Sequence, residues 1–112
     1  MSGRYKSIVD VLVLLHRPDG RVLLLRRAAP EYAGQLTIVG GHLKPGEPLD
    51  SAARREAGEE AGIRISADQQ EFCGLVHHHQ PAGTDRITAV FVAQSWAGEP
   101  FNAEPDKHEG LF

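Results

Sequence analysis

The chain has 112 residues, the size of one domain with a single core. Hydrophobic residues make up 41% and charged residues 24%, which is typical of a folded globular protein and excludes a disordered tail. A formal net charge of -3 provides no basic field that could hold a long nucleic acid by its phosphates, so we expect no duplex nucleic acid partner.

A single cysteine, Cys73, excludes an intramolecular disulfide, and we interpret its thiol as a small buried hydrophobic group. The first apolar run, residues 8–15, is interrupted by Asp10 and is shorter than the roughly 18 residues of a membrane span. No small-residue cleavage site of a signal peptide follows it. These features predict a cytoplasmic protein that does not enter a membrane.

The first predicted elements form a β-hairpin. Residues 8–16 and 21–27 are rich in leucine and β-branched residues, and the segment between them reads Arg-Pro-Asp-Gly. Proline at Pro18 presets its φ angle and glycine at Gly20 accepts a positive one, as a tight turn requires.

A loop and a short strand come next. Residues 28–34 contain a proline and a glycine, and residues 35–39 have the composition of a strand. We expect the pair Gly40-Gly41 to end this strand.

A helix of three to four turns is predicted over residues 48–61. Pro48 suits the first turn, where its missing N–H costs nothing, and Gly62 suits the position just past the end.

Two further strands are predicted in the second half of the chain. Residues 71–80 form the first, residues 81–85 form a turn, and residues 86–96 form the longest strand. The middle of this last strand is apolar on both faces, so we expect it to lie centrally in a sheet. Residues 101–112 are polar and contain proline, and we expect no helix there.

The predicted helix places Glu56, Glu59 and Glu60 on one face, because their spacing is i, i+3 and i+4. Like charges at these spacings repel, and Gly58 within the helix costs up to about 1 kcal/mol relative to alanine. A solvated acidic face is the commoner meaning of such a pattern. A bound divalent cation, which prefers carboxylate oxygens, would instead turn the repulsion into ligation.

Residues 41–63 read GHLKPGEPLDSAARREAGEEAGI. This segment resembles the signature of the Nudix (MutT-like) hydrolases, and every fixed position of that signature is filled. The matching residues are Gly41, Glu47, Arg55, Glu56, Ala57, Glu59, Glu60, Gly62 and Ile63.

The resemblance implies an α/β fold, the Nudix-type α/β/α sandwich with a mixed β-sheet, in which residues 1–112 form one domain. The chain stops at Phe112, where relatives continue into a further strand and a closing helix. We therefore expect the C-terminal strand and helix to be absent, through truncation or because a partner subunit, as in a homodimer, covers that face. Leu36 and Val39 replace a tryptophan and a proline of many relatives without removing a ligand.

By the same resemblance, the activity is Mg²⁺-dependent hydrolysis of a nucleoside diphosphate linked to another group, with Mn²⁺ as a substitute cation. The metal ligands would be Glu56, Glu59, Glu60 and the carbonyl of Gly40, with Glu56 or Glu60 as the base. Arg55 would position the glutamates by ion pairing. Glu47 would support the loop and the outer shell of the site.

Three more positions are candidates for substrate contact. Arg27 resembles a family phosphate contact, although a solvated arginine at a strand end is an equal alternative. Glu104 lies where some relatives place an additional metal-binding or base-activating acid, against the alternative of a solvated acid. In His77-His78-His79 the outer two share a face of a strand, and we favour a structural or substrate-lining role for His77 over metal binding.

The leading substrate is a nucleoside triphosphate, which would give a nucleoside monophosphate and pyrophosphate. ADP-ribose or another nucleotide sugar is the main rival. A non-catalytic nucleotide-sensing module would be expected to lose the box glutamates, whereas this chain keeps them all. An inactive fragment is the remaining alternative.

Overall fold

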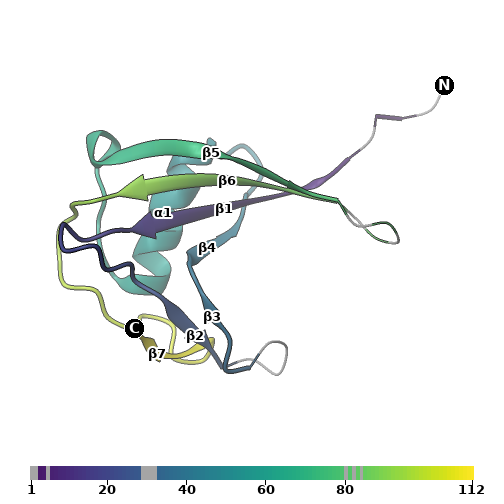
Figure 1. Cartoon of the computed structure of the whole chain (residues 1–112). Coiled ribbons are helices and arrows are strands. Elements are labelled where there is room, and N and C mark those ends of the chain that lie inside the picture. Colours follow the sequence, from purple (N-terminus) through teal and green to yellow (C-terminus); the bar gives the residue numbers. More distant parts are fainter. Residues whose placement is uncertain (1–2, 5, 29–32, 80, 82, 84) are drawn as a thin grey trace.

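The computed structural model describes residues 3–4, 6–28, 33–79, 81, 83 and 85–112. It contains two β-sheets, one α-helix and a short 3₁₀-helix (Figure 1). In chain order the elements are β1 (Ile8–Leu15), β2 (Leu25–Arg27), β3 (Leu36–Thr37), β4 (Val39–His42), α1 (Leu49–Ala61), η1 (Ala67–Gln69), β5 (Gln70–His78), β6 (Arg86–Ala93) and β7 (His108–Leu111).

The larger sheet has the strand order β4-β1-β6-β5 and is mixed. β1 and β6 run parallel with Val11 opposite Ala89, whereas β4 and β5 pair antiparallel with their neighbours. The central position predicted for β6 is confirmed, and its apolar composition on both faces is the reason. Alternate side chains of β1 and β6 point toward α1 and form the core with it. Those strand residues are Val11, Val13, Leu15, Ala89, Phe91 and Ala93.

The predicted helix is confirmed, with Pro48 as its N-cap and Gly62, at φ 69°, as its C-cap. A Cβ at Gly62 would also collide with the ring of Phe101, so glycine is required there twice over. The face of α1 that meets the sheet consists of small side chains, which let the helix approach closely. These are Ala52, Ala53, Ala57 and Ala61, all fully buried.

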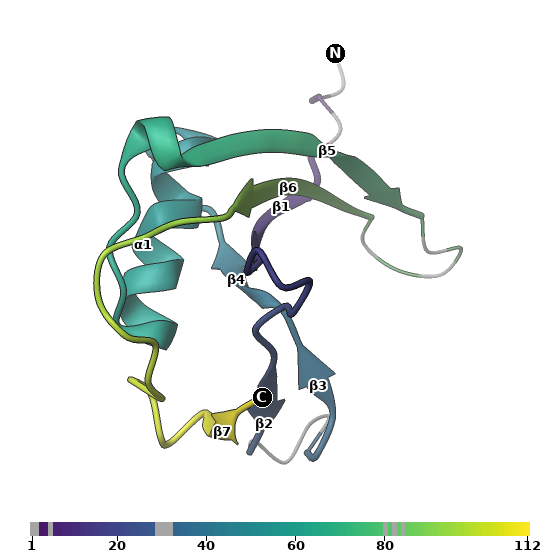
Figure 2. The same cartoon turned by 60° about the vertical axis from the view of Figure 1, so that its left-hand side comes forward.

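The hairpin prediction is only partly right. The turn closes as expected, since the Arg17 N–H donates to the Arg21 carbonyl at 2.8 Å and His16 bridges to Val22. The following strand, however, begins only at Leu25 and pairs with β3 and β7 in a second, three-stranded sheet (Figure 2). Both edges of β1 are already taken by β4 and β6, so the returning chain must leave the larger sheet.

The prediction that Gly40 and Gly41 end their strand is wrong. Both lie inside β4, opposite Leu12 and Val11 of β1. A Cβ at Gly40 would collide with the Val11 carbonyl, which identifies a close backbone approach rather than a strand end. Val39, where many relatives have proline, is fully buried in the core, whereas Leu36 is exposed.

The C-terminal segment contains a strand, β7, that was not predicted from the sequence. β7 pairs antiparallel with β2, with Leu111 opposite Leu25 and His108 opposite Arg27. Its sequence, HEGL, is too short and polar to signal a strand by periodicity, and the pairing with β2 defines it. Within the described residues, α1 is the one α-helix, and it covers one face of the larger sheet (Figure 2). The fold is therefore a mixed sheet layered with a helix, as the α/β prediction requires.

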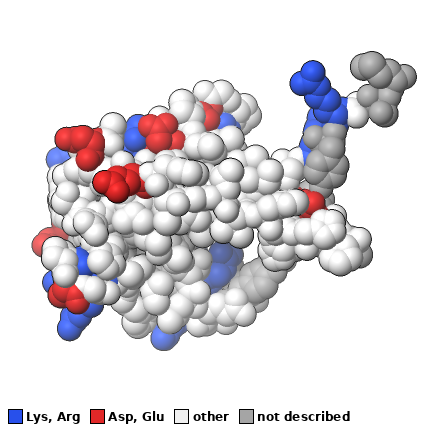
Figure 3. All heavy atoms as spheres, turned by 45° about the horizontal axis from the view of Figure 1, so that its top comes forward, with Lys and Arg blue, Asp and Glu red and all other residues white. Residues whose placement is uncertain are grey.

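β5 forms an edge of the larger sheet and carries exposed apolar side chains at Phe72, Leu75 and Val76. Cys73, predicted to be buried, is exposed beside the β-bulge of this strand. In the view of Figure 3, in which the top of Figure 1 comes forward, the middle of the surface carries few charged side chains. In the part of the chain that the structure describes, no helix has the length and apolarity to cross a membrane.

Candidate active site

Arg55, on α1, joins three of the glutamates of the box. Its Nε and Nη2 donate to the two carboxylate oxygens of Glu47 at 2.7 and 3.0 Å. Its Nη1 donates to Glu56 at 2.7 Å and to Glu59 at 3.2 Å, and Nη2 also reaches the His42 carbonyl at 3.0 Å. The hydrogen bonds to the three glutamates raise the pKa of Arg55, and the bond to Glu47 has the largest effect. The same bond lowers the pKa of Glu47. Arg55 is therefore placed to fix the glutamates relative to one another and to β4.

Glu60 lies deeper than the other glutamates and is 7% exposed. Its Oε1 accepts a hydrogen bond from the Gly40 N–H at 2.8 Å. Burial, assisted by the charges of Glu56 and Glu104, raises the pKa of Glu60 to about 8 against the lowering effect of that bond. Burial also raises the pKa of Glu56. Both shifts mark negative charge that the protein alone does not fully compensate, which a bound cation would relieve.

Gly41 brings the backbone of β4 against the glutamate cluster. A Cβ at this position would stand 2.5 Å from Oε1 and 2.6 Å from Cδ of Glu56. The candidate metal ligands gathered here are carboxylate oxygens, and they fit a hard divalent cation such as Mg²⁺. Gly40 contacts Glu60 through its N–H, and the participation of its carbonyl in metal binding stays a prediction.

Glu104 and His108 join this cluster from the C-terminal segment. Glu60, Glu104 and His108 each offer a ligand atom, and these three atoms lie within 4.8 Å of one another. His108 is 3% exposed, and burial lowers its pKa. Glu104 was a candidate from the sequence, whereas His108 was not, and its only signal is its position four residues after Glu104.

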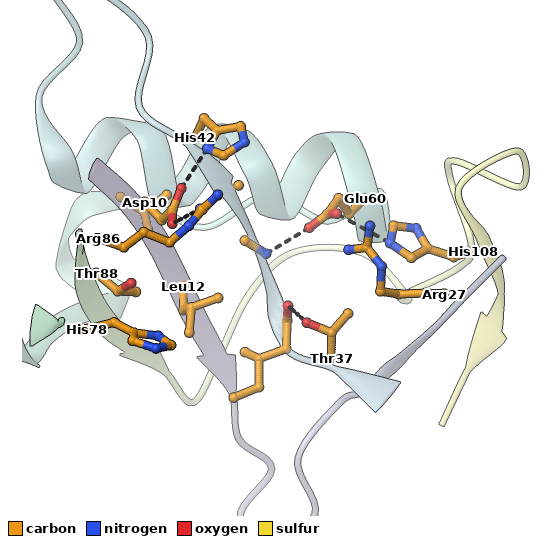
Figure 4. A pocket seen from close by; sticks show the side chains of 14 residues that line it. Asp10, Leu12, Arg27, Thr37, His42, Glu60, His78, Arg86, Thr88 and His108 are labelled. Atoms are coloured by element: carbon orange, nitrogen blue, oxygen red, sulfur yellow. Dashed lines mark hydrogen bonds and ion pairs between the residues drawn. The ribbon is translucent and has the colours of Figure 1, made fainter. Parts of the chain in front are cut away.

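Two cavities meet at β4. One, of about 620 Å³, is lined by Lys44, Arg55 and the three helix glutamates. The other, of about 540 Å³, lies over the face of the larger sheet that points away from α1 and is shown in Figure 4. Both are lined by Arg27, Gly40, Gly41, His42, Glu60 and His108. Arg27 thus borders the glutamate cluster and the neighbouring cavity at once, a position that suits a phosphate contact.

The second cavity contains a polar group, centred on Asp10, that was not among the site residues predicted from the sequence. Asp10 accepts a hydrogen bond from Arg86 Nη1 at 2.6 Å through one oxygen, and its other oxygen lies 2.6 Å from His42 Nδ1 (Figure 4). Thr88 and His78 line the same cavity. The available signal was Asp10 itself, a charged residue in an otherwise apolar strand.

The three consecutive histidines lie on alternating faces, as strand geometry predicts. His77 Nε2 and His79 Nδ1 each lie 3.1 Å from Asp85 Oδ2, so these two share a face. His78 points to the other face and lines the second cavity. His77, the histidine predicted to contact substrate, lies away from that cavity, and His78 has the position expected of such a contact.

Comparison with known proteins identifies the family. A model of the NUDIX domain matches residues 6–112. The oxidized purine nucleoside triphosphate hydrolase of Danio rerio is 35% identical over 104 residues, which are 92% of this chain and 64% of that protein. The human NAD-capped RNA hydrolase NUDT12 is 36% identical over 67 residues, 58% of this chain and 14% of that protein.

Among solved structures, a MutT NUDIX hydrolase from Burkholderia pseudomallei superposes with a TM-score of 0.85 at 33% identity, covering 96% of this chain and 82% of that one. The chain spans less than two thirds of the length of both curated relatives, and about one seventh of the human protein. The family match nevertheless covers both sheets, α1 and every residue of the glutamate cluster. This chain belongs to the NUDIX family.

Proposed function

We propose that this chain is a divalent-metal-dependent pyrophosphohydrolase that cleaves a phosphoanhydride bond in a nucleoside diphosphate-linked substrate. A nucleoside triphosphate, giving a nucleoside monophosphate and pyrophosphate, is the leading candidate. The observation that carries the proposal is the hydrogen bonding of Glu47, Glu56 and Glu59 by Arg55, directly beside a strand that has no side chains at Gly40 and Gly41. Similarity to a nucleoside triphosphate hydrolase over 92% of the chain supports the substrate class.

Mg²⁺, with Mn²⁺ as a substitute, is the proposed cofactor, held by Glu56, Glu59, Glu60 and the Gly40 carbonyl. When bound, such a cation neutralises phosphate oxygens and lowers the pKa of a water molecule. Arg55 contacts both Glu56 and Glu59, so its part in the reaction is to set the spacing of their carboxylates. Glu56 and Glu60 are the two candidates for the base that accepts the proton of the attacking water.

In this proposal the two cavities bind different parts of the substrate. The phosphates lie in the cavity of the glutamate cluster, next to Arg27 and Lys44, and the nucleoside lies in the cavity lined by Leu12, His78 and Thr88. Arg27 borders both, so it would contact the phosphate nearest the nucleoside. The Asp10–Arg86 pair offers an acceptor and donors to the polar edge of a base or a sugar.

The decisive experiment incubates the purified chain with Mg²⁺ and a panel of nucleoside triphosphates, with ADP-ribose and a nucleotide sugar in parallel, and separates the products by anion-exchange chromatography. We expect a monophosphate and pyrophosphate, and no product after chelation of the metal. Glu59→Gln should lower the rate by orders of magnitude, whereas Glu71→Gln, on the exposed edge strand, should not. Folded protein that hydrolyses no member of the panel would refute the proposal, and hydrolysis confined to ADP-ribose would reassign the substrate.

A further inference from the structure

Three side chains next to the turn between β5 and β6 form a cluster of candidate metal ligands outside the active site. His77 Nε2 and His79 Nδ1 each lie 3.1 Å from Oδ2 of Asp85, the residue directly before β6. None of the three residues lines either cavity of the candidate active site. The cluster is therefore separate from the glutamates of α1, and an inference drawn from it does not rest on the proposed function.

The pleat of the chain brings the two histidines to one carboxylate. Residues two apart in an extended chain point to the same face. His78, between them, points to the other face and lines the cavity there (Figure 4). Sequence spacing predicted this shared face but offered no carboxylate for it. The antiparallel register of β5 and β6, with His78 opposite Arg86, brings Asp85 beside the two imidazoles.

Asp85 is held in place, whereas the histidines face solvent. The side chain of Asp85 is 12% exposed, and its backbone carbonyl accepts hydrogen bonds from Ser7 Oγ at 2.8 Å and from the Ile8 N–H at 3.3 Å. The side chains of His77 and His79 are 60% and 71% exposed. A largely buried carboxylate gains free energy from a cationic partner. An ion from solvent can reach this carboxylate between the two exposed rings.

The spacing of these atoms suits one ion. With bonds of about 2.1 Å, neighbouring ligand atoms on the same cation lie about 3.0–3.4 Å apart. The distance of 3.1 Å from each histidine nitrogen to Asp85 Oδ2 already has this length. The two nitrogens need to approach each other, which rotation of the exposed rings of His77 and His79 can supply. Without an ion, each ring N–H can donate to the carboxylate, and the ion would take the place of these protons.

We propose that His77, His79 and Asp85 bind a divalent transition metal ion, with Zn²⁺ as the representative. Two imidazoles and one carboxylate favour such ions over Mg²⁺, which prefers oxygen ligands, so this site and the glutamates of α1 select different ions. Water completes the coordination, because both rings face solvent. The ion cross-links the end of β5 to the residue that precedes β6. It thereby stabilises the hairpin from which His78 and Arg86 reach the cavity on the other face.

A Zn²⁺ titration followed by nuclear magnetic resonance tests each histidine nitrogen separately and needs no turnover. Untagged, chelator-treated, ¹⁵N-labelled chain receives Zn²⁺ in the presence of excess Mg²⁺, which occupies the proposed carboxylate site. We expect the signals of His77 Nε2 and His79 Nδ1 to shift together along one saturation curve, while the nitrogens of His78 do not shift. Signals of His77 and His79 that stay in place, or that follow two different curves, would overturn the inference.

Zn²⁺ affinity, followed at the remaining histidine signal, provides a second measurement. His77→Gln and His79→Gln each remove one exposed ring and should weaken binding by at least about tenfold, because loss of even an outer partner of a metal ligand costs about 10–100-fold. His78→Gln is the matched control on the other face and should leave the affinity unchanged. Equal affinities in all three variants would contradict a shared site. Glu59→Gln separates the two proposals, since it should lose hydrolysis while the Zn²⁺-dependent shifts remain.

Discussion

Gly41 lies directly against the carboxylate of Glu56: a Cβ added at residue 41 would stand 2.5 Å from Oε1 and 2.8 Å from Oε2. No side chain other than hydrogen fits between strand β4 and this glutamate. The glycine therefore sets the distance between the backbone of the strand and the charged face of α1.

Gly41→Ala should displace Glu56 and lower kcat by about 10²-fold, since a misplacement of about 1 Å can cost that much. Overpacking of this kind should also destabilise the fold by about 1–3 kcal/mol. Steady-state kinetics and thermal unfolding measure the two effects. Gly74→Ala is the matched control, because a Cβ there meets no atom within 4 Å. Full activity in Gly41→Ala would show that Glu56 tolerates displacement.

Arg55→Lys keeps the positive charge but loses the planar group that bonds both oxygens of Glu47 while reaching Glu56. We expect kcat to fall by about 10–100-fold, the usual effect of removing a group that orients metal ligands, with a smaller change in KM. The neighbouring Arg54→Lys alters the pair with Asp50, of which the carboxylate is half exposed, and a hydrogen bond to Ser51 at 3.4 Å, so its effect should be small. Equal effects of the two substitutions would contradict the positioning role of Arg55.

Glu47 provides a pH-dependent contribution to stability. Its hydrogen bond with Arg55 lowers its pKa below the ordinary value of 4.5, so the ionised form is favoured in the folded state. The resulting stability is present above the unfolded-state pKa and is lost as the pH falls through the lower, folded-state pKa. We expect Glu47→Gln to be less stable than the unmodified chain at pH 7. This gap, the difference in stability between the two proteins, should narrow in acid below pH 4.5.

Thermal unfolding at a series of pH values, with chelator present, measures that gap. Glu71→Gln, which removes an exposed carboxylate from strand β5, serves as the reference and should show little difference at any pH. A gap for Glu47→Gln that stays constant into acid would mean that its effect does not arise from the ion pair.

Gly58 lies inside α1 on its exposed side, and a Cβ there would make only an ordinary contact at 3.6 Å with the Ile63 carbonyl. Gly58→Ala should therefore stabilise the chain by about 0.5–1 kcal/mol through helix propensity, with activity unchanged. Gly62→Ala should do the opposite, since Gly62 has a positive φ and its Cβ would collide with Phe101. Chemical denaturation of both variants compares them directly, and a destabilised Gly58→Ala would indicate a packing role for that glycine.

Local patterns predicted the elements whose signals are local. Pro48 and Gly62 bracket α1 because a helix end requires particular backbone geometry, and the apolar run of β6 indicated a strand buried on both faces. Local patterns did not predict the elements whose bounds depend on strand pairing. The predicted strand ended before Gly40, although both glycines lie in β4, and the predicted hairpin was too long, because local patterns do not show that both edges of β1 are occupied.

The sequence by itself determined the family resemblance, the helix and the common face of Glu56, Glu59 and Glu60, since helical spacing depends only on neighbours along the chain. Tertiary structure alone decided that β7 pairs with β2, that His108 meets Glu60, and that Asp10 meets Arg86 across β1 and β6. The physical reason is distance along the chain. The last two contacts join residues 48 and 76 positions apart, and only the packing of strands and helix brings them together.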